Sequence, residues 1–414
     1  MKKQKIKKIS IVIVLVISLA INILTASIVG LYSIIAFLES YTHNLVFYEG
    51  QRINNVIVNE FGSTHYFVTE DAVYWDGDFV FQDHNKDIKD MTDWANNHRD
   101  ANFHYYREAS PVLLLEEKVK DVCLTNGPIN NHSCHSLILT ESGDLYTQDW
   151  LEVEKIDDNI SSVCYDSEIN TFYYIDNEER LFSCNQNMEK TFLTDGVKAV
   201  QACIGRVLIL NGSGDLCELD LETESISEPL FTNVEKFEAD DASERIKRIN
   251  EKWKSYKDLD AEESLLINVL DKQGKLFAKG AYNSAFTFVN ENYLHTYDDW
   301  ECIGENVSNF SLSSAGTMML LNDGSATYHG YEEGTGYNDD EYNVIFGTKT
   351  LVSDGAVTVG CSRRTVWVIS EHVIMFWGRN DIFNAGEVYY SHKHRIFTGG
   401  PIVIERAYSE RLNR

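Results

Sequence analysis

Residues 136–146, SLILTESGDLY, carry a pattern that occurs seven times in this chain. An apolar strand ends, a polar turn follows, and a second apolar or aromatic strand begins six or seven positions later, which predicts a β-hairpin. The other copies are HYFVTEDAVYW (65–75), TFYYIDNEERLF (171–182), VLILNGSGDLC (207–217), LINVLDKQGKLF (266–277), MMLLNDGSATY (318–328) and VWVISEHVIMFW (366–377).

The spacing of the copies indicates the architecture. The last apolar residue of each first strand serves as an anchor, and the anchors lie 71, 36, 35, 60, 51 and 48 residues apart. Such a period is typical of propeller blades. A propeller grows by adding blades, so it escapes the size limit of one hydrophobic core. We therefore predict an all-β, seven-bladed β-propeller over residues 39–414, with anchors Val68, Leu139, Ile175, Leu210, Leu270, Leu321 and Ile369.

The chain begins with five lysines within residues 1–8, followed by residues 9–38 without a charged side chain. An apolar run of this length can span a bilayer, and the lysines keep the N-terminus cytoplasmic. The alternative is a cleaved signal peptide, whose apolar core is about 7–15 residues long. Small residues stand at 25–27, but the apolar run continues to Leu38. We predict a cytoplasmic head (1–8), a single-pass cell-membrane anchor (9–38) and an extracytoplasmic propeller.

The formal charge is −28, and −33 without the five N-terminal lysines. Nucleic acid is therefore a poor partner, whereas cations or basic proteins would be attracted. Eight cysteines permit disulfides but leave 105 pairings open. Cys164 and Cys217 lie in apolar strands, where a free thiol packs as a small hydrophobe. The low proline count and the many Lys, Asn, Ile and Asp residues suggest a bacterial source with an AT-rich genome.

Two insertions interrupt the repeats, at 78–110 and 238–263. The second predicts an amphipathic helix, capped at Asp241 or Ser243, with an apolar stripe recurring every three or four residues. The stripe either packs on the propeller or docks a partner. The candidate binding residues are Ile246, Ile249, Trp253 and Tyr256. Residues 45–61 are expected to supply the first strands of the first blade, and residues 395–405 to return to that blade and close the ring.

Acidic residues crowd the loop 332–341, which also holds two glycines. Calcium prefers several carboxylate and carbonyl oxygens on a flexible turn, but the order of a calcium loop is absent. A solvated acidic loop is the default, and the calcium candidates are Glu332, Glu333, Asp339 and Asp340. Two histidine groups lack a second ligand pair at metal spacing, namely His132, Cys134 and His135, and His392 with His394. No other cofactor is indicated.

Residues 377–386, WGRNDIFNAG, follow the last hairpin. This run resembles the signature of the regulator of chromosome condensation repeat family, and 127–146 is a second match. The first match keeps Trp377, Gly378, Asn380 and Gly386 but departs at 383–385. The resemblance covers residues 45–405 and implies a seven-bladed propeller. One family branch exchanges nucleotide on a small GTPase, and secreted bacterial propellers of another branch bind a protein through loops on one face. The loops here match neither.

No linear catalytic motif is present. We therefore predict a propeller, not an enzyme, that binds a protein or cell-envelope ligand through the loops at 78–110, around Trp253 and at 332–341. The alternative is a cell-envelope carbohydrate-active enzyme with carboxylates in the propeller channel, because such sites gather residues from several blades. A third interpretation is a calcium-stabilised spacer.

Overall fold

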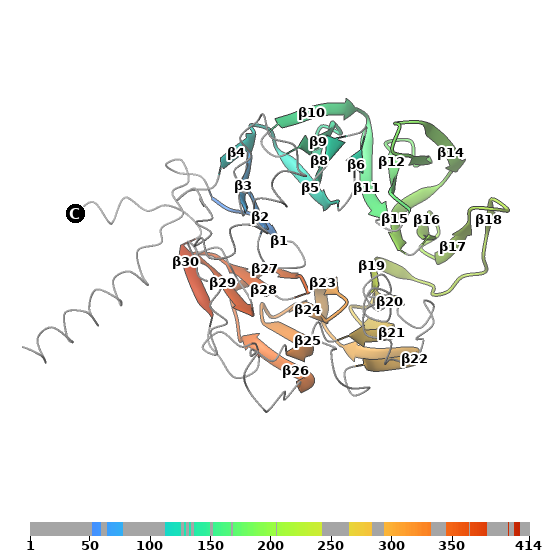
Figure 1. Ribbon diagram of the computed structural model, residues 1–414. Coiled ribbons are helices and arrows are strands. Elements are labelled where there is room, and N and C mark those ends of the chain that lie inside the picture. Colours follow the sequence, from blue (N-terminus) through green and yellow to red (C-terminus); the bar gives the residue numbers. More distant parts are fainter. Residues whose placement is uncertain are drawn as a thin grey trace, which may run out of the picture. The chain divides into compact units, whose positions relative to one another are not determined.

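The structure is a computed structural model. It describes residues 52–58, 64–77, 112–125, 128–129, 132–133, 136–149, 152–166, 169–203, 205–241, 265–283, 294–332, 345–363, 365–378, 396 and 401–405. The regular elements within these ranges are all β-strands. They form seven four-stranded antiparallel sheets, or blades, and one short hairpin (Figure 1).

The blades follow one another in chain order. Blade 1 contains β1 (Asn55–Val58), β2 (Thr64–Val68), β3 (Val73–Gly77) and β4 (Val112–Leu115). Blade 2 contains β5 (Val119–Leu124), β8 (Ser136–Thr140), β9 (Leu145–Asp149) and β10 (Glu152–Asp157), and its first connection holds the hairpin β6 (Pro128–Ile129) and β7 (His132–Ser133). Blade 3 contains β11 (Ile160–Asp166), β12 (Thr171–Asp176), β13 (Leu181–Cys184) and β14 (Lys190–Thr194). Blade 4 contains β15 (Val197–Cys203), β16 (Arg206–Asn211), β17 (Leu216–Asp220) and β18 (Ser225–Ile226).

Blade 5 contains β19 (Val234–Asp241), β20 (Leu265–Asp271), β21 (Leu276–Asn283) and β22 (Leu294–Gly304). Blade 6 contains β23 (Val307–Ser313), β24 (Gly316–Leu321), β25 (Ala326–Glu332) and β26 (Ile345–Val352). Blade 7 contains β27 (Ala356–Cys361), β28 (Thr365–Ser370), β29 (Val373–Gly378) and β30 (Ile402–Glu405). We call the four strands of each blade A to D in chain order.

The seven predicted hairpins are confirmed as strands B and C of the seven blades. One anchor is wrong by one residue. Leu320 pairs with Ala326, as Leu139 pairs with Leu145 in blade 2, so Leu320 is the anchor and Leu321 begins the turn. The sequence offered two adjacent leucines, and only their register with the next strand distinguishes them.

Each blade contacts the next, and blade 7 contacts blade 1 through β27 and β1, so the blades form a closed ring. The A strands of neighbouring blades lie side by side and line its axis. The predicted closure by residues 395–405 is wrong, because β30 pairs with β29 within blade 7. β1 is the inner strand of blade 1, as expected for part of 45–61. The four strands of every blade therefore come from one stretch of the chain, and no sheet combines strands from the two ends of the propeller.

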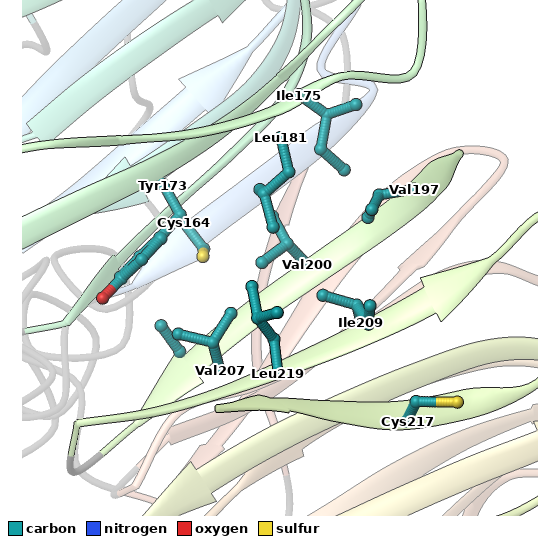
Figure 2. Close-up of a cluster of buried hydrophobic side chains, with 11 residues drawn as sticks. Cys164, Tyr173, Ile175, Leu181, Val197, Val200, Val207, Ile209, Cys217 and Leu219 are labelled. Atoms are coloured by element: carbon teal, nitrogen blue, oxygen red, sulfur yellow. The ribbon is translucent and has the colours of Figure 1, made fainter. Parts of the chain in front are cut away.

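The core consists of the interfaces between blades, as the cluster between blades 3 and 4 illustrates (Figure 2). Apolar side chains of the two sheets point toward one another there. Burial of each aliphatic side chain contributes about 1.5–3 kcal/mol, before the entropy cost of ordering the chain. The cluster comprises Cys164, Tyr173, Ile175, Leu181, Val197, Val200, Ala202, Val207, Ile209, Cys217 and Leu219.

A repeated backbone hydrogen bond joins neighbouring blades. In blades 2 to 6, the turn between strands B and C contains one residue with a positive φ: Gly143, Glu179, Gly214, Gly274 and Gly324. The carbonyl of this residue accepts the first N–H of the next A strand at 2.8–3.0 Å, from Ile160, Val197, Val234, Val307 and Ala356. We call this bond the turn clamp.

A short polar side chain also closes most of these turns. In blade 3, Asp176 accepts hydrogen bonds from the Glu178 and Arg180 backbone amides at 2.9 and 3.0 Å. Burial would raise the pKa of Asp176, but these amides and the Arg180 guanidinium outweigh it, so the pKa lies below its ordinary value. Thr69, Thr140, Asn211, Asp271 and Ser370 bond their own turns in the same way.

Blades 1 and 7 have B–C turns that are one residue shorter. At the seam between these blades, the Arg52 side chain donates Nη2–H to the Glu371 carbonyl at 2.9 Å. Arg52 lies three residues before the first strand of blade 1, and Glu371 lies in the B–C turn of blade 7. A side chain therefore contributes to the ring closure in the place where a backbone amide acts at five other seams.

The turn clamp gives a stability prediction. Glu179 adopts φ 61°, a conformation that costs a residue with a Cβ about 1 kcal/mol and that glycine adopts freely. We expect Glu179→Gly to stabilise the protein by about 1 kcal/mol in urea unfolding. The converse change, Gly143→Glu, should destabilise it, because φ is 90° and a Cβ would lie 3.1 Å from the Ile160 carbonyl oxygen. Loss of stability in Glu179→Gly would contradict the role given to this turn.

Candidate functional site

The two faces of the ring differ in the length of their connections. The turn clamp places the B–C turns and the D–A connections on one face, which we call the turn face. These segments are short, and the longest is 227–233. The A–B and C–D connections leave the strands at the opposite end, on the loop face. All the long connections belong to the loop face: 78–111, 125–135, 242–264, 284–293, 333–344 and 379–401.

The three predicted binding segments therefore start and end on the same face, although they lie far apart in sequence. Residues 78–110 connect strands C and D of blade 1, the predicted helix connects A and B of blade 5, and the acidic loop connects C and D of blade 6. The binding candidates Ile246, Ile249, Trp253 and Tyr256 lie outside the described residues. β19 extends to Asp241, so the insertion begins at 242 and Asp241 ends a strand.

The metal candidates also fall mainly outside the described residues. Glu332 ends β25, whereas Glu333, Asp339 and Asp340 lie outside the described ranges. His132 lies in β7, while Cys134, His135, His392 and His394 are likewise outside. Within the described ranges, no three His, Cys, Asp or Glu side chains are grouped as a metal would require. Calcium binding by the acidic loop stays a prediction.

Carboxylates line the inner strands, where the enzyme alternative would place its site. Asp121 is open to water but lies among the inner strands of several blades. Their partial desolvation of its carboxyl raises the pKa of Asp121, and the nearby Glu238 carboxylate raises it further. A raised carboxyl pKa suits a general acid.

The neighbouring inner-strand carboxylates are already engaged. Glu238 pairs with Lys236 at 2.8 Å and accepts the Leu312 N–H at 2.7 Å. Asp240 accepts the Ser314 N–H at 2.6 Å. Both side chains hold the next blade in place, so neither offers a free acid or base beside Asp121.

A cluster of aromatic and histidine side chains fills the seam between the outer strands of blades 5 and 6. His295 stacks on Phe346 with ring centroids 3.9 Å apart, and Tyr297 and His329 are hydrogen-bonded at 3.0 Å. Beneath them, the Tyr282 hydroxyl lies 2.8 Å from Thr317 Oγ1. We call Tyr282, His295, Tyr297, His329 and Phe346 the aromatic cluster. Its strands end at the loop-face connections 284–293 and 333–344.

His329 is buried in this cluster. Its Nδ1 lies 2.7 Å from Thr348 Oγ1, and its Nε2 contacts the Tyr297 hydroxyl. Burial, with a smaller contribution from nearby His295, lowers the pKa of His329 to about 4. Burial also lowers the pKa of His295, which is partly exposed. The cluster therefore contains two neutral imidazoles at pH 7, of which His295 offers a ring to solvent or to a ligand.

Sequence reasoning missed this cluster. Its members come from β21, β22, β25 and β26, and they occupy no fixed spacing. The closest signal was the alternation of His295 and Tyr297, which places both side chains on one face of a strand. Only the packing of blade 5 against blade 6 brings His329 and Phe346 to them.

The described cysteines are free thiols. Cys164 and Cys217 are buried in the cluster between blades 3 and 4, as the sequence predicted for small apolar side chains. Burial raises the pKa of both thiols, so they are poor nucleophiles. Cys134 lies outside the described residues.

Within the described ranges there is no helix of the length and apolarity needed to cross a membrane. The predicted span, 9–38, lies outside those ranges.

No protein-family model matches the chain, and no curated protein matches its sequence. Among solved structures, Prp20p of Saccharomyces cerevisiae is 11% identical, with a TM-score of 0.49 over 90% of this chain and 89% of Prp20p. The Cps50 (Swd1) propeller of Myceliophteria thermophila is 8% identical, with a TM-score of 0.45 over 78% of this chain and 96% of that domain.

PorZ of Porphyromonas gingivalis, a bacterial surface component of the type-IX secretion system, is 14% identical, with a TM-score of 0.39 over 63% of this chain. The match spans 32% of PorZ, about a third of its length. At these values the comparisons transfer no partner or activity. The seven-bladed architecture rests on the strand pairing of the chain itself.

The buried imidazole gives a pH prediction. His329 has a folded pKa of about 4, below the unfolded value of about 6.5, so the unfolded chain binds more protons between these values. The stability from His329 is present above pH 6.5 and is lost as the pH falls toward 4, by roughly 3 kcal/mol. Urea unfolding should show a smaller loss over this window in His329→Gln. The exposed control His372→Gln should retain the wild-type loss, and equal losses in all three proteins would contradict this assignment.

Proposed function

We propose that this chain is a membrane-anchored, extracytoplasmic propeller that binds a protein or cell-envelope ligand through its loop face. The observation that carries the proposal is the segregation of every long connection to one face of a rigid ring. Recognition residues concentrate on loops held by a rigid scaffold. The turn face, by contrast, is committed to holding the blades together, because its turns and strand starts bond one another.

The aromatic cluster supports a binding role for the same face. Aromatic side chains are enriched at the centres of interfaces, where they add contact area at low entropy cost. His295, Tyr297 and Phe346 are partly exposed and lie on strands that lead into loop-face connections. The exposed ring edges of these three side chains offer contact area and ring-stacking surface to a ligand on this face.

The membrane anchor is proposed from the sequence. Residues 9–38 lack charge and follow a lysine-rich head of eight residues. The acidic propeller would then lie outside the cytoplasm, where cationic or basic ligands reach it.

The docking role of the blade 5 insertion is testable by deletion. We expect removal of residues 242–259 from the full chain to abolish capture of the partner from an envelope extract, measured by mass spectrometry. The circular dichroism spectrum should stay that of a β-protein, because the deletion begins beyond β19 and ends before β20. Glu141→Ala on the turn face serves as the control and should capture normally. Undiminished capture by the deletion variant would rule out docking through this segment.

The anchor makes a separate prediction. The full chain should stay with membranes during an alkaline carbonate wash, because a spanning helix resists extraction whereas peripheral attachment does not. A chain lacking residues 1–38 should appear in the soluble fraction. Recovery of a soluble, shortened product from the full-length gene would instead show a cleaved signal peptide.

A further inference from the structure

Arg363 is a buried cation for which the described part of the structure supplies no partner. It lies in the A–B turn of blade 7, on the loop face, and is 7% exposed. Among the residues that the structure describes, no acceptor lies within hydrogen-bonding distance of its buried Nε or Nη2. A buried guanidinium that lacks an acceptor is strongly destabilising, because its hydration is lost and nothing replaces it.

Two other seams show how a carboxylate can bond an A–B turn. The seventh residue of the A strand is Asp166 in blade 3 and Asp240 in blade 5. Asp166 Oδ2 accepts the Gly205 N–H at 2.8 Å, and Asp240 Oδ2 accepts the Ser314 N–H at 2.6 Å. Each carboxylate therefore bonds the A–B turn of the following blade. We call this contact the loop-face clamp.

The seam between blades 6 and 7 lacks that carboxylate. The seventh residue of β23 is Ser313, whose hydroxyl bonds the Gly316 carbonyl and lies 3.2 Å from Cys361 Sγ. Blade 7 is close at this point, because the Cys361 amide also donates to Ser311 Oγ at 3.1 Å. Arg363 follows two residues later and occupies the register position that Ser314 has in blade 6. The turn that receives a carboxylate in blades 4 and 6 thus carries a guanidinium in blade 7, and the preceding A strand offers it no acid.

We propose that Arg363 anchors a carboxylate-binding site on the loop face, beside the seam of blades 6 and 7. A ligand carboxylate would supply the anion that Asp166 and Asp240 supply to the turns of blades 4 and 6. A guanidinium fork suits a carboxylate, which it can bind through two parallel N–H···O bonds. The inference names the ligand chemistry of the proposed binding face and so rests on the proposed function, but its test needs no partner.

The test is thermal unfolding of the full chain in detergent, with sodium acetate or sodium chloride at equal ionic strength. Acetate should raise the midpoint of the wild-type protein by about 1 °C relative to chloride at 100 mM, because it binds the folded state. Arg363→Met should show no such difference, and Arg363→Lys, which keeps the charge but loses the fork, should show less than the wild type. Arg206→Met is the matched control, because Arg206 begins strand B of blade 4 and is already paired with Glu218 at 2.6 and 2.7 Å. It should retain the acetate effect.

The unfolding midpoint of Arg363→Met relative to the wild type, both measured in sodium chloride, provides a second readout. Arg363→Met should melt at or above the wild type, because it removes a charge that lacks an acceptor in the free protein. A clearly lower midpoint would show that the guanidinium is already paired within the chain, and would overturn the proposal. So would an equal response of the wild type and Arg363→Met to acetate. Either result would leave capture of a partner by the loop face untouched.

Discussion

The turn clamp is the contact on which the rest of the ring depends. In blades 3 to 7, one backbone N–H at the start of the inner strand meets one carbonyl in the preceding blade, and that carbonyl belongs to a residue with positive φ. This geometry fixes both the length of the B–C turn and the point where the next blade begins. An insertion there would break the bond between blades, so the turn face has little freedom to vary. On the loop face, the described contact of this kind joins blades 3 to 4 and blades 5 to 6, and the long connections accumulate on this face.

The sequence revealed strands B and C because both of their faces are buried between blades. They therefore appear as apolar runs, broken by a polar turn that has glycine at the positive-φ position in blades 2, 4, 5 and 6. The outer strands gave no comparable signal, since β10 and β14 are mostly exposed. The inner strands alternate buried and channel-facing residues and were recognised only in part. The choice between Leu320 and Leu321, and the pairing of β30, depended on register between strands, which one sequence does not contain.

The candidate sites were harder to predict than the fold for a physical reason. Each is made at a seam, from blades that are distant in sequence. The aromatic cluster joins His295 of blade 5 with Phe346 of blade 6, and neither residue is unusual in its own strand. Nothing in the sequence sets Arg363 apart, because its burial and its lack of a described acid partner are properties of the assembled seam. Sequence reasoning named three long insertions as binding segments, and only the topology of the assembled ring shows that all three start and end on one face.

In the proposed function, the turn face holds the blades together and the loop face is the binding surface. At the seam of blades 6 and 7, the Ala356 N–H donates to the Gly324 carbonyl at 2.9 Å, so the turn clamp is present. Apolar side chains of both blades, among them Met318 and Trp377, pack between the sheets. The blades therefore hold together there without a carboxylate on the loop face. Because the turn clamp and the apolar core stabilise this seam, its loop-face end can carry an uncompensated charge, which the proposed carboxylate ligand would neutralise. A propeller can in this way build a polar binding site at a seam, where adjacent turns already converge, without opening its core.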